Sequence, residues 1–251
     1  MSCKIPCLRW HSFHTHKRGN APDEYEDAFA GDANTARFAV ADGATESSFV
    51  AAWAKLLVEG FVAAKGRSWR KLDWLGPSRQ NWADDIDPLP LPWYAEQKRE
   101  EGAYATLLGV AFSCGRNGRL GGSWRALAVG DSCLFRLRGG QLVKSFPLVR
   151  SSEFGNQPAL LGSRGRQVDT PTQGIQLARG RWRPGDRFLL MTDALAEWML
   201  RRHEQEQRPA DDLAQLLVGS EPQDAFAAWV EERRIGQGLR NDDVTLVVID
   251  L

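Results

Sequence analysis

Residues 187–193 read Arg-Phe-Leu-Leu-Met-Thr-Asp, and this stretch decides the fold class. Its compact apolar run has the length of a buried β-strand, and the strand ends on an aspartate. Leu195, Ala196, Met199 and Leu200 then recur at helical spacing. The stretch therefore predicts a strand that delivers an aspartate to the start of a helix.

The same order of strand, aspartate and helix occurs earlier in the chain. Residues 37–41 predict a strand that ends at the turn pair Asp42-Gly43. Apolar residues then recur at helical spacing over 49–64, and Gly66 follows as a C-terminal stop. Two similar units thus lie on either side of the middle of the chain.

The rest of the chain reads as short strands followed by helices. Tight turns separate strands predicted at 104–112, 124–129, 133–137, 142–146 and, on an edge, 175–177. Helices are predicted over 211–218 and from a capping box at 220–223 to Gly236, before a last strand at 244–249. This pattern predicts an α+β fold in which helices cover antiparallel sheet.

Composition excludes several classes of protein. The 251 residues are 43% hydrophobic and 25% charged, which predicts one globular domain over 1–251, and we expect a monomer. The 32 basic and 32 acidic residues cancel, which removes the electrostatic reason to expect nucleic acid or anionic membrane as a partner. Lys55 and Glu59 interrupt the longest apolar stretch, so no membrane span is predicted.

The cysteines and the first residues bear on the compartment. Four cysteines are too few and too scattered for the disulfide framework of a small secreted domain: Cys3, Cys7, Cys114 and Cys133. The first sixteen residues contain no apolar core of a signal peptide. The expected location is therefore a reducing cytoplasm.

Residues 66–102 have a different composition from the rest, with tryptophans interleaved with prolines. Trp69, Trp74, Trp82 and Trp93 share this segment with four prolines that break any continuous element. We expect a flap or insertion built as an irregular helix-loop-helix. Its indole rings either pack over the core or, over 68–93, bind a peptide partner.

Acidic residues stand at four predicted strand ends: Asp42, Asp131, Asp193 and Asp242. Any one of them can be a turn or capping residue. Together they predict a shared site, whose carboxylates would repel one another unless divalent cations neutralise them. No His or Cys stands beside them, so oxygen ligands favour Mg²⁺ or Mn²⁺ over Zn²⁺. Two such ions with a bridging water suit in-line attack on phosphorus.

Five segments in order resemble the motifs of the metal-dependent protein phosphatases, the PPM or type 2C family, in a divergent bacterial branch: 26–29 (Glu-Asp-Ala-Phe), 41–44 (Ala-Asp-Gly-Ala), 128–132 (Ala-Val-Gly-Asp-Ser), 188–193 (Phe-Leu-Leu-Met-Thr-Asp) and 242–245 (Asp-Asp-Val-Thr). The resemblance implies a four-layer αββα sandwich of two antiparallel sheets flanked by helices. It also implies a centre of two Mn²⁺ or Mg²⁺ ions, with a third in some members, at one end of the sandwich.

The resemblance implies a role for each matching acid. Asp42 would bridge the two ions, and the Gly43 carbonyl would bind one of them. Asp193 and Asp242 would hold the other ion, and Asp131 would serve the third. The first-motif acid is Asp27, with Glu26 beside it as a direct or water-mediated ligand. Asp243 stands where the family usually has Asn, so either of the last two acids could be the ligand.

Two departures from the family pattern concern the phosphate and the leaving group. Pro22 stands where many members have a phosphate-binding Arg, and Lys17 or Arg18 is the candidate substitute. Ala44 stands where many members have a His that protonates the leaving group. His14 and His16 are the candidate general acids, because a histidine titrates near neutral pH.

A zinc site at the N-terminus is an alternative use of these histidines. Soft and borderline ligands gather there: Cys3, Cys7, His11, His14 and His16. The spacing lacks the Cys-x2-Cys pairs of structural zinc sites. Residues 8–15 also suit a plain strand with histidines on its solvent face.

The favoured function is hydrolysis of phosphoserine and phosphothreonine esters in protein substrates, by attack of a metal-bridging water, in signalling. The alternative is a pseudophosphatase, or a phosphoprotein-binding regulatory module with the same fold, because the Arg and the His are missing. An interaction module that uses the Trp-rich segment is a third hypothesis. The enzyme is favoured because all the metal-binding acids are present.

Overall fold

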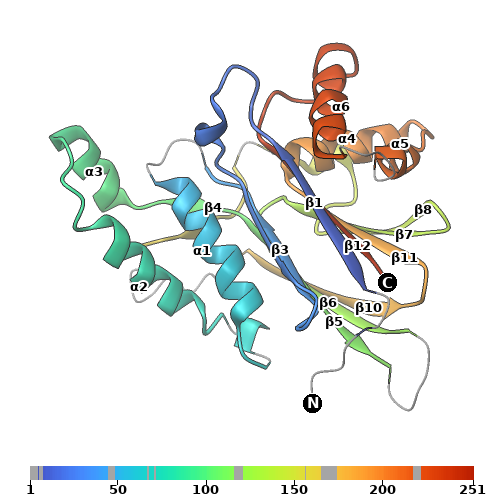
Figure 1. Ribbon diagram of the computed structural model, residues 1–251, viewed down its shortest axis with the longest axis horizontal. Helices are drawn as coiled ribbons and strands as arrows, with labels where there is room; N and C mark the ends of the chain where they lie inside the picture. Colours follow the sequence, from blue (N-terminus) through green and yellow to red (C-terminus); the bar gives the residue numbers. More distant parts are fainter. Residues whose placement is uncertain are drawn as a thin grey trace.

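The computed structural model describes residues 5, 8–44, 49–66, 68–70, 72–115, 121–155, 157–164, 174–216 and 222–251. These residues form two five-stranded antiparallel sheets that face each other, with helices on the outside of both (Figure 1). The α+β class and the four-layer αββα arrangement expected from the sequence are confirmed.

The first sheet carries the C-terminal part of the chain together with its first strand. Its spatial order is β1 (Arg9–Thr15), β12 (Val244–Asp250), β11 (Asp186–Met191), β7 (Cys133–Arg138) and β8 (Gln141–Phe146). Gly139 and Gly140 both have positive φ values, of 56° and 76°, in the two-residue turn between β7 and β8. This is the backbone that a tight hairpin turn requires, and glycine adopts it without strain.

The second sheet carries four strands from residues 28–129 and one later strand. Its spatial order is β10 (Ile175–Trp182), β6 (Gly122–Val129), β5 (Leu107–Cys114), β3 (Arg37–Ala41) and β2 (Ala28–Asp32). A separate two-stranded sheet pairs β4 (Tyr104–Ala105) with β9 (Leu161–Gly162). An isolated bridge joins Gly43 to Ala105, so the small sheet lies directly beside the end of β3.

Aromatic side chains fill the space between the two sheets. Phe38 on β3, Phe112 on β5 and Phe188 on β11 are buried in one cluster. The rings of Phe112 and Phe188 meet edge to face, with centroids 4.9 Å apart. Since these residues belong to both sheets, the alternate side chains of each strand point into a shared core.

The helices form the two outer layers. Three pack outside the second sheet or beside it: α1 (Val50–Ala63), α2 (Leu75–Ile86) and α3 (Trp93–Glu101). Three pack on the first sheet: α4 (Asp193–Glu204), α5 (Pro209–Leu216) and α6 (Pro222–Gly236). Short 3₁₀ turns complete the chain: η1 (Pro22–Glu24), η2 (Ser68–Arg70) and η3 (Ser151–Glu153). No helix in the described ranges is long and apolar enough to cross a membrane.

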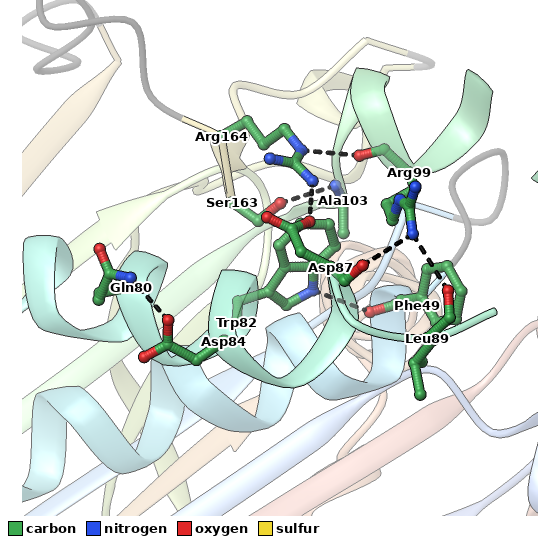
Figure 2. Close-up of polar contacts among 10 residues, drawn as sticks. All are labelled: Phe49, Gln80, Trp82, Asp84, Asp87, Leu89, Arg99, Ala103, Ser163 and Arg164. Carbon is green, nitrogen blue, oxygen red and sulfur yellow. Dashed lines mark hydrogen bonds and ion pairs between the residues drawn. The ribbon is translucent and has the colours of Figure 1, made fainter. Parts of the chain in front are cut away.

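The Trp-rich segment forms η2, α2 and α3. Trp69, Trp74 and Trp82 are buried against α1, whereas Trp93 is 79% exposed. Figure 2 shows how Arg164 fastens this segment: its Nε donates to the Arg99 carbonyl at 2.7 Å, and its guanidinium pairs with Asp87. The three buried indoles therefore serve packing.

Some elements differ from those predicted from the sequence. The strand predicted at 104–112 is divided into β4 and β5 at Thr106, whose backbone N–H donates to the Asp42 carbonyl at 2.8 Å. The short edge strand predicted at 175–177 extends to Trp182, because β10 pairs with β6 along its whole length. The strand β2 was not predicted, and the capping-box residues 220–221 lie outside the described residues.

Candidate metal centre

The predicted acids meet where strands of both sheets end. Asp42 follows β3, Asp131 follows β6 after one glycine, and Asp193 follows β11 and begins α4. Carboxylate oxygens of Asp42, Asp131 and Asp193 lie within 4.8 Å of one another. Asp242, just before β12, lines the same pocket, whose volume is about 650 Å³. Acids that are far apart in the sequence thus form one cluster in the structure.

Local contacts fix the loop that carries Asp42. Its backbone N–H donates to Thr106 Oγ1 at 3.1 Å, and Thr106 Oγ1 also contacts Ser132 Oγ at 3.0 Å. A Cβ on Gly43 would lie 2.7 Å from the Glu26 carbonyl oxygen. Only glycine allows this close approach, so the residue is required by the packing of two backbones.

Asp193 is held at the positive end of a helix. Thr192 precedes it as the N-cap residue of α4, in extended conformation. A carboxylate in the first turn is favoured there by the unpaired backbone N–H groups and the helix dipole. Thr192 Oγ1 also accepts the Thr245 backbone N–H at 2.9 Å, which ties the start of α4 to β12.

Asp27 lies behind this cluster and is linked to both sheets. Its Oδ2 accepts a hydrogen bond from Thr245 Oγ1 at 2.7 Å, and the Tyr25 hydroxyl is hydrogen-bonded to the same Thr245 oxygen. Burial, followed by the negative charges of Asp243 and Asp193, raises the pKa of Asp27 well above its usual range. The ordinary hydrogen bonds of this carboxylate do not offset its burial.

The cluster is crowded with negative charge. Burial raises the pKa of Asp42 well above its usual range, and repulsion from Asp27 and Asp193 adds to the shift. Burial and the charge of Asp193 raise the pKa of Asp131 to about 6. Both shifts have the direction expected of carboxylates that lack a sufficient counter-charge.

The residues present fit divalent cations. Asp27 Oδ1 and Asp131 Oδ1 are buried and have no hydrogen-bond partner in the described part of the chain. Buried carboxylate oxygens without partners are costly, and a cation with oxygen ligands would satisfy them. Carboxylates together with a nearby backbone carbonyl form the hard donor set that Mg²⁺ and Mn²⁺ prefer.

The last two acids of the chain's fifth motif have different surroundings. Both carboxylate oxygens of Asp243 accept backbone N–H groups, from Lys17 at 2.7 Å and from Glu26 at 2.6 Å. Asp242 lines the pocket instead. Asp243 thus links the loop between β1 and η1 to the first motif, whereas Asp242 lies beside the cluster.

One positively charged side chain, that of Arg240, reaches into the pocket from the loop that precedes β12. The Arg240 guanidinium is hydrogen-bonded to Asp193 Oδ2, and its Nε lies 3.6 Å from Asp242 Oδ2. Sequence reasoning missed this residue, as it missed Thr106. The only signal for Arg240 was its place just before the last acidic pair.

The candidate residues His14, His16 and Arg18 are not among the residues that line the pocket. The His14 ring packs against Tyr25, with centroids 5.0 Å apart, and burial lowers its pKa. His16 Nδ1 contacts the Lys17 carbonyl at 3.0 Å. Arg18 pairs with Glu231 at 3.0 Å, and its side chain is 61% exposed.

The zinc alternative involves residues on β1 and before it. His11 and His14 are exposed on β1, which pairs with β12 along its length. Cys3 and Cys7 lie outside the described residues. His11 and His14 thus belong to a regular edge strand of the first sheet, and His16 follows directly after it.

Two facing antiparallel sheets, helices outside them and a carboxylate cluster at one end define the class: a metal-dependent phosphatase fold. The chain belongs to the protein phosphatase 2C family, whose family model matches residues 14–233. The family resemblance expected from the five motifs is therefore confirmed.

Several solved phosphatase structures share this fold. The serine/threonine phosphatase PstP/Ppp of Mycobacterium tuberculosis is 20% identical, with 97% of this chain and 98% of that one covered, at a TM-score of 0.61. The photosystem II phosphatase PBCP is 16% identical, with 97% and 98% covered, at a TM-score of 0.62.

A structure of the PstP catalytic domain in complex with two manganese ions is 18% identical, with 97% of both chains covered, at a TM-score of 0.61. These likenesses show the fold. No curated protein matches the chain by sequence.

Proposed function

We propose that this protein is a Mn²⁺- or Mg²⁺-dependent protein phosphatase that hydrolyses phosphoserine and phosphothreonine esters. One observation carries the proposal: Asp42, Asp131 and Asp193 converge in one pocket, with a buried carboxylate oxygen of Asp131 left without a protein partner among the described residues. The serine/threonine specificity is supported by membership of the family and by the structural neighbours, which include serine/threonine phosphatases.

The ligand set follows from the placement of the acids. Asp42 and the Gly43 carbonyl would hold one cation, Asp193 and Asp242 the second, and Asp131 a third. Asp27 would contribute its unpartnered oxygen, with Glu26 beside it. When bound, the divalent cations neutralise the carboxylates and the phosphate and activate a water for in-line attack at neutral pH.

The chain's own residues orient this site. Thr106 fixes the Asp42 loop from the side of the second sheet, and Thr192 with Thr245 fixes Asp193 and Asp27 from the side of the first sheet. Because these hydroxyls are bonded in place, the carboxylates need little reorganisation to receive cations. Neither His14 nor His16 lines the pocket, so the proposal gives neither of them the proton transfer to the leaving group.

The test compares turnover with and without metal. Purified protein is incubated with a phosphothreonine peptide and with an aryl phosphate, in Mn²⁺, in Mg²⁺ or in chelator. We expect turnover only with metal, and a loss of at least ~100-fold in Asp42→Asn, because charge stabilisation by the cations contributes several kcal/mol. Asp85→Asn is the matched control, since Asp85 is exposed on α2.

Two results would count against the enzyme. Turnover in chelator, or an unchanged rate in Asp42→Asn, would contradict a metal-dependent mechanism at this cluster. Tight binding of the phosphopeptide with no turnover at saturating Mn²⁺ would instead indicate the pseudophosphatase alternative. That alternative rests on Pro22 and Ala44, which replace two residues that many family members use.

A further inference from the structure

Arg240 has an unusual position for a surface cation. Of the described residues that line the 650 Å³ pocket, it is the only one with a positive charge. Its side chain remains 40% exposed, yet it reaches two carboxylates from different elements, Asp193 on α4 and Asp242 before β12. Its positive charge thus offsets part of the negative charge of the acidic cluster.

Arg240 and a cation would use the same oxygens. The guanidinium is hydrogen-bonded to Asp193 Oδ2 and faces Asp242 Oδ2, and these are the two acids that we propose for one cation. A carboxylate oxygen that is bound to a divalent cation is a poor acceptor for a second cation, because the positive charges repel. If these oxygens held a metal ion, the guanidinium would be free to turn into the pocket.

The loop that carries Arg240 is fixed, so only its side chain needs to move. Leu239 is 3% exposed and belongs to the core under α4 and α6. Arg234 donates to the Asp242 carbonyl and, at 3.1 Å, to the His16 carbonyl. Asn241 Oδ1 accepts the Arg18 backbone N–H at 2.8 Å. A released guanidinium would therefore stay at the rim of the pocket.

We propose that Arg240 is the residue that binds the substrate phosphate, and that it exchanges Asp193 and Asp242 for the phosphate oxygens when metal is bound. A guanidinium matches two phosphate oxygens in a bidentate pair, and its charge is permanent. This inference rests on the proposed function. Arg240 would take the role of the phosphate-binding arginine that Pro22 replaces, although it lies near the opposite end of the chain.

The two earlier candidates, Lys17 and Arg18, make other contacts. Arg18 pairs with Glu231 on α6. The Lys17 backbone is held by Asp243, and neither Lys17 nor Arg18 lines the pocket. Among the described positively charged side chains, Arg240 would therefore be the first that a phosphate in the pocket contacts.

The test uses three variants and two binding measurements that do not need turnover. Arg240→Gln removes the charge, Arg240→Lys keeps the charge without the planar fork, and Arg18→Gln is the matched control. Binding of Mn²⁺ to metal-free protein and binding of inorganic phosphate to Mn²⁺-loaded protein are measured by calorimetry. Thermal unfolding of each variant shows whether it is folded.

We expect opposite effects of Arg240→Gln on the two ligands. Mn²⁺ binds about fivefold more tightly, because a competitor for the carboxylates is gone. Phosphate binds about 10- to 100-fold more weakly, because hydrogen bonds to a charged group are lost. The KM for a phosphopeptide rises by a similar factor. Arg240→Lys gives an intermediate loss of phosphate affinity, and Arg18→Gln changes neither constant.

Unchanged phosphate affinity in Arg240→Gln would overturn the inference, and so would a weaker affinity for Mn²⁺, which would make Arg240 a positioning residue for the acids. The inference and the proposed function fail separately. Binding that depends on Arg240 without any turnover leaves the inference standing. Metal-dependent turnover with an unaltered KM in Arg240→Gln removes the inference alone.

Discussion

At the scale of single residues, the carboxylates of the pocket make the metal-free protein sensitive to pH. Burial raises the pKa of Asp131 from 3.8 to about 6. Between these values the folded protein binds more protons than the unfolded chain, so stability falls as the pH rises. The shift in Asp131 corresponds to at most about 3 kcal/mol, and Asp42 and Asp27 act in the same direction.

This predicts a melting temperature in chelator that is lower at about pH 8 than at about pH 5. Asp131→Asn should flatten part of this slope, since the neutral amide does not titrate. Saturating Mn²⁺ should raise the melting temperature most at the higher pH, because the cation neutralises the same carboxylates. A melting temperature in chelator that rises over this pH range would contradict the prediction.

The acids of the site were predictable from the sequence, whereas their partners were not. Asp42, Asp131 and Asp193 follow strand ends that hydrophobic patterns reveal, and strand ends of packed sheets meet. The pairing of Arg240 with Asp193 joins residues far apart in the sequence, and local pattern carries no information about it. The same is true of the backbone amides that hold Asp243.

At the scale of elements, the helical arm formed by α2 and α3 is held by its buried indoles and also by a few polar contacts from one arginine. Arg164 bonds to Arg99 and Asp87 and lies over the Trp82 ring at 5.2 Å, as Figure 2 shows. Directly next to Arg164, Ser163 Oγ accepts the Ala103 backbone N–H at 2.9 Å. The arm is thereby fastened to the small sheet that borders Asp42.

Arg164→Ala should loosen this arm. We expect a melting temperature lower by a few degrees, since the change removes a partly exposed ion pair and a cation–π contact worth about 1–2 kcal/mol together. Limited proteolysis within 66–102 should become faster, and hydrolysis of a small aryl phosphate should change little. Lys98→Ala, on the exposed side of α3, is the control. Equal proteolysis of the two variants would show that Arg164 does not fasten the arm.

Elements with a strong hydrophobic period were predicted well, and those fixed by pairing were not. The apolar run of β11 and the helical period of α1 and α4 lie in the sequence itself. The residues of β2, which include Gly31, have no strand period, and they become a strand because they pair with β3. Residues 178–182 of β10 are likewise in a strand because β6 pairs with them.

At the scale of the whole molecule, an ion pair with a buried carboxylate lies at the end of β11 opposite the metal cluster. Asp186 is 1% exposed and accepts two hydrogen bonds from Arg138, at 2.7 and 2.8 Å, and one from the Arg183 backbone. Burial raises its pKa, but Arg138 and this amide more than offset the burial, and the pKa lies below its usual value. Its contribution is therefore present above pH 3.8 and lost below it.

Asp186→Asn should destabilise the protein by about 2–3 kcal/mol, because a buried carboxylate loses its charge-assisted hydrogen bonds, while Arg138 keeps access to water. Denaturant unfolding at neutral pH measures this loss. Asp250→Asn is the matched control: its pair with Arg187 is about one quarter exposed on each side, and the expected cost is within about 1 kcal/mol. Equal costs for the two variants would contradict the argument from burial.

The sandwich itself was predictable in kind. The pattern of strands and helices indicates antiparallel sheet covered by helices, and the five motifs identify the family, whose resemblance implies two sheets with helices outside. The order of strands within each sheet was not predictable, since β1 joins β12 from the other end of the chain. That the whole chain acts as a single phosphatase domain, with 66–102 as an insertion, stays a prediction.

The contact between Arg240 and the pocket acids has a consequence for how relatives of this protein vary. If two positions, that of Pro22 and that of Arg240, are alternative sources of one guanidinium, selection needs only one of them at a time. Homologous sequences should then divide into two groups, with arginine either before the first motif or before the last acidic pair. Replacement at one position would be tolerated only in a lineage that had already acquired the other arginine.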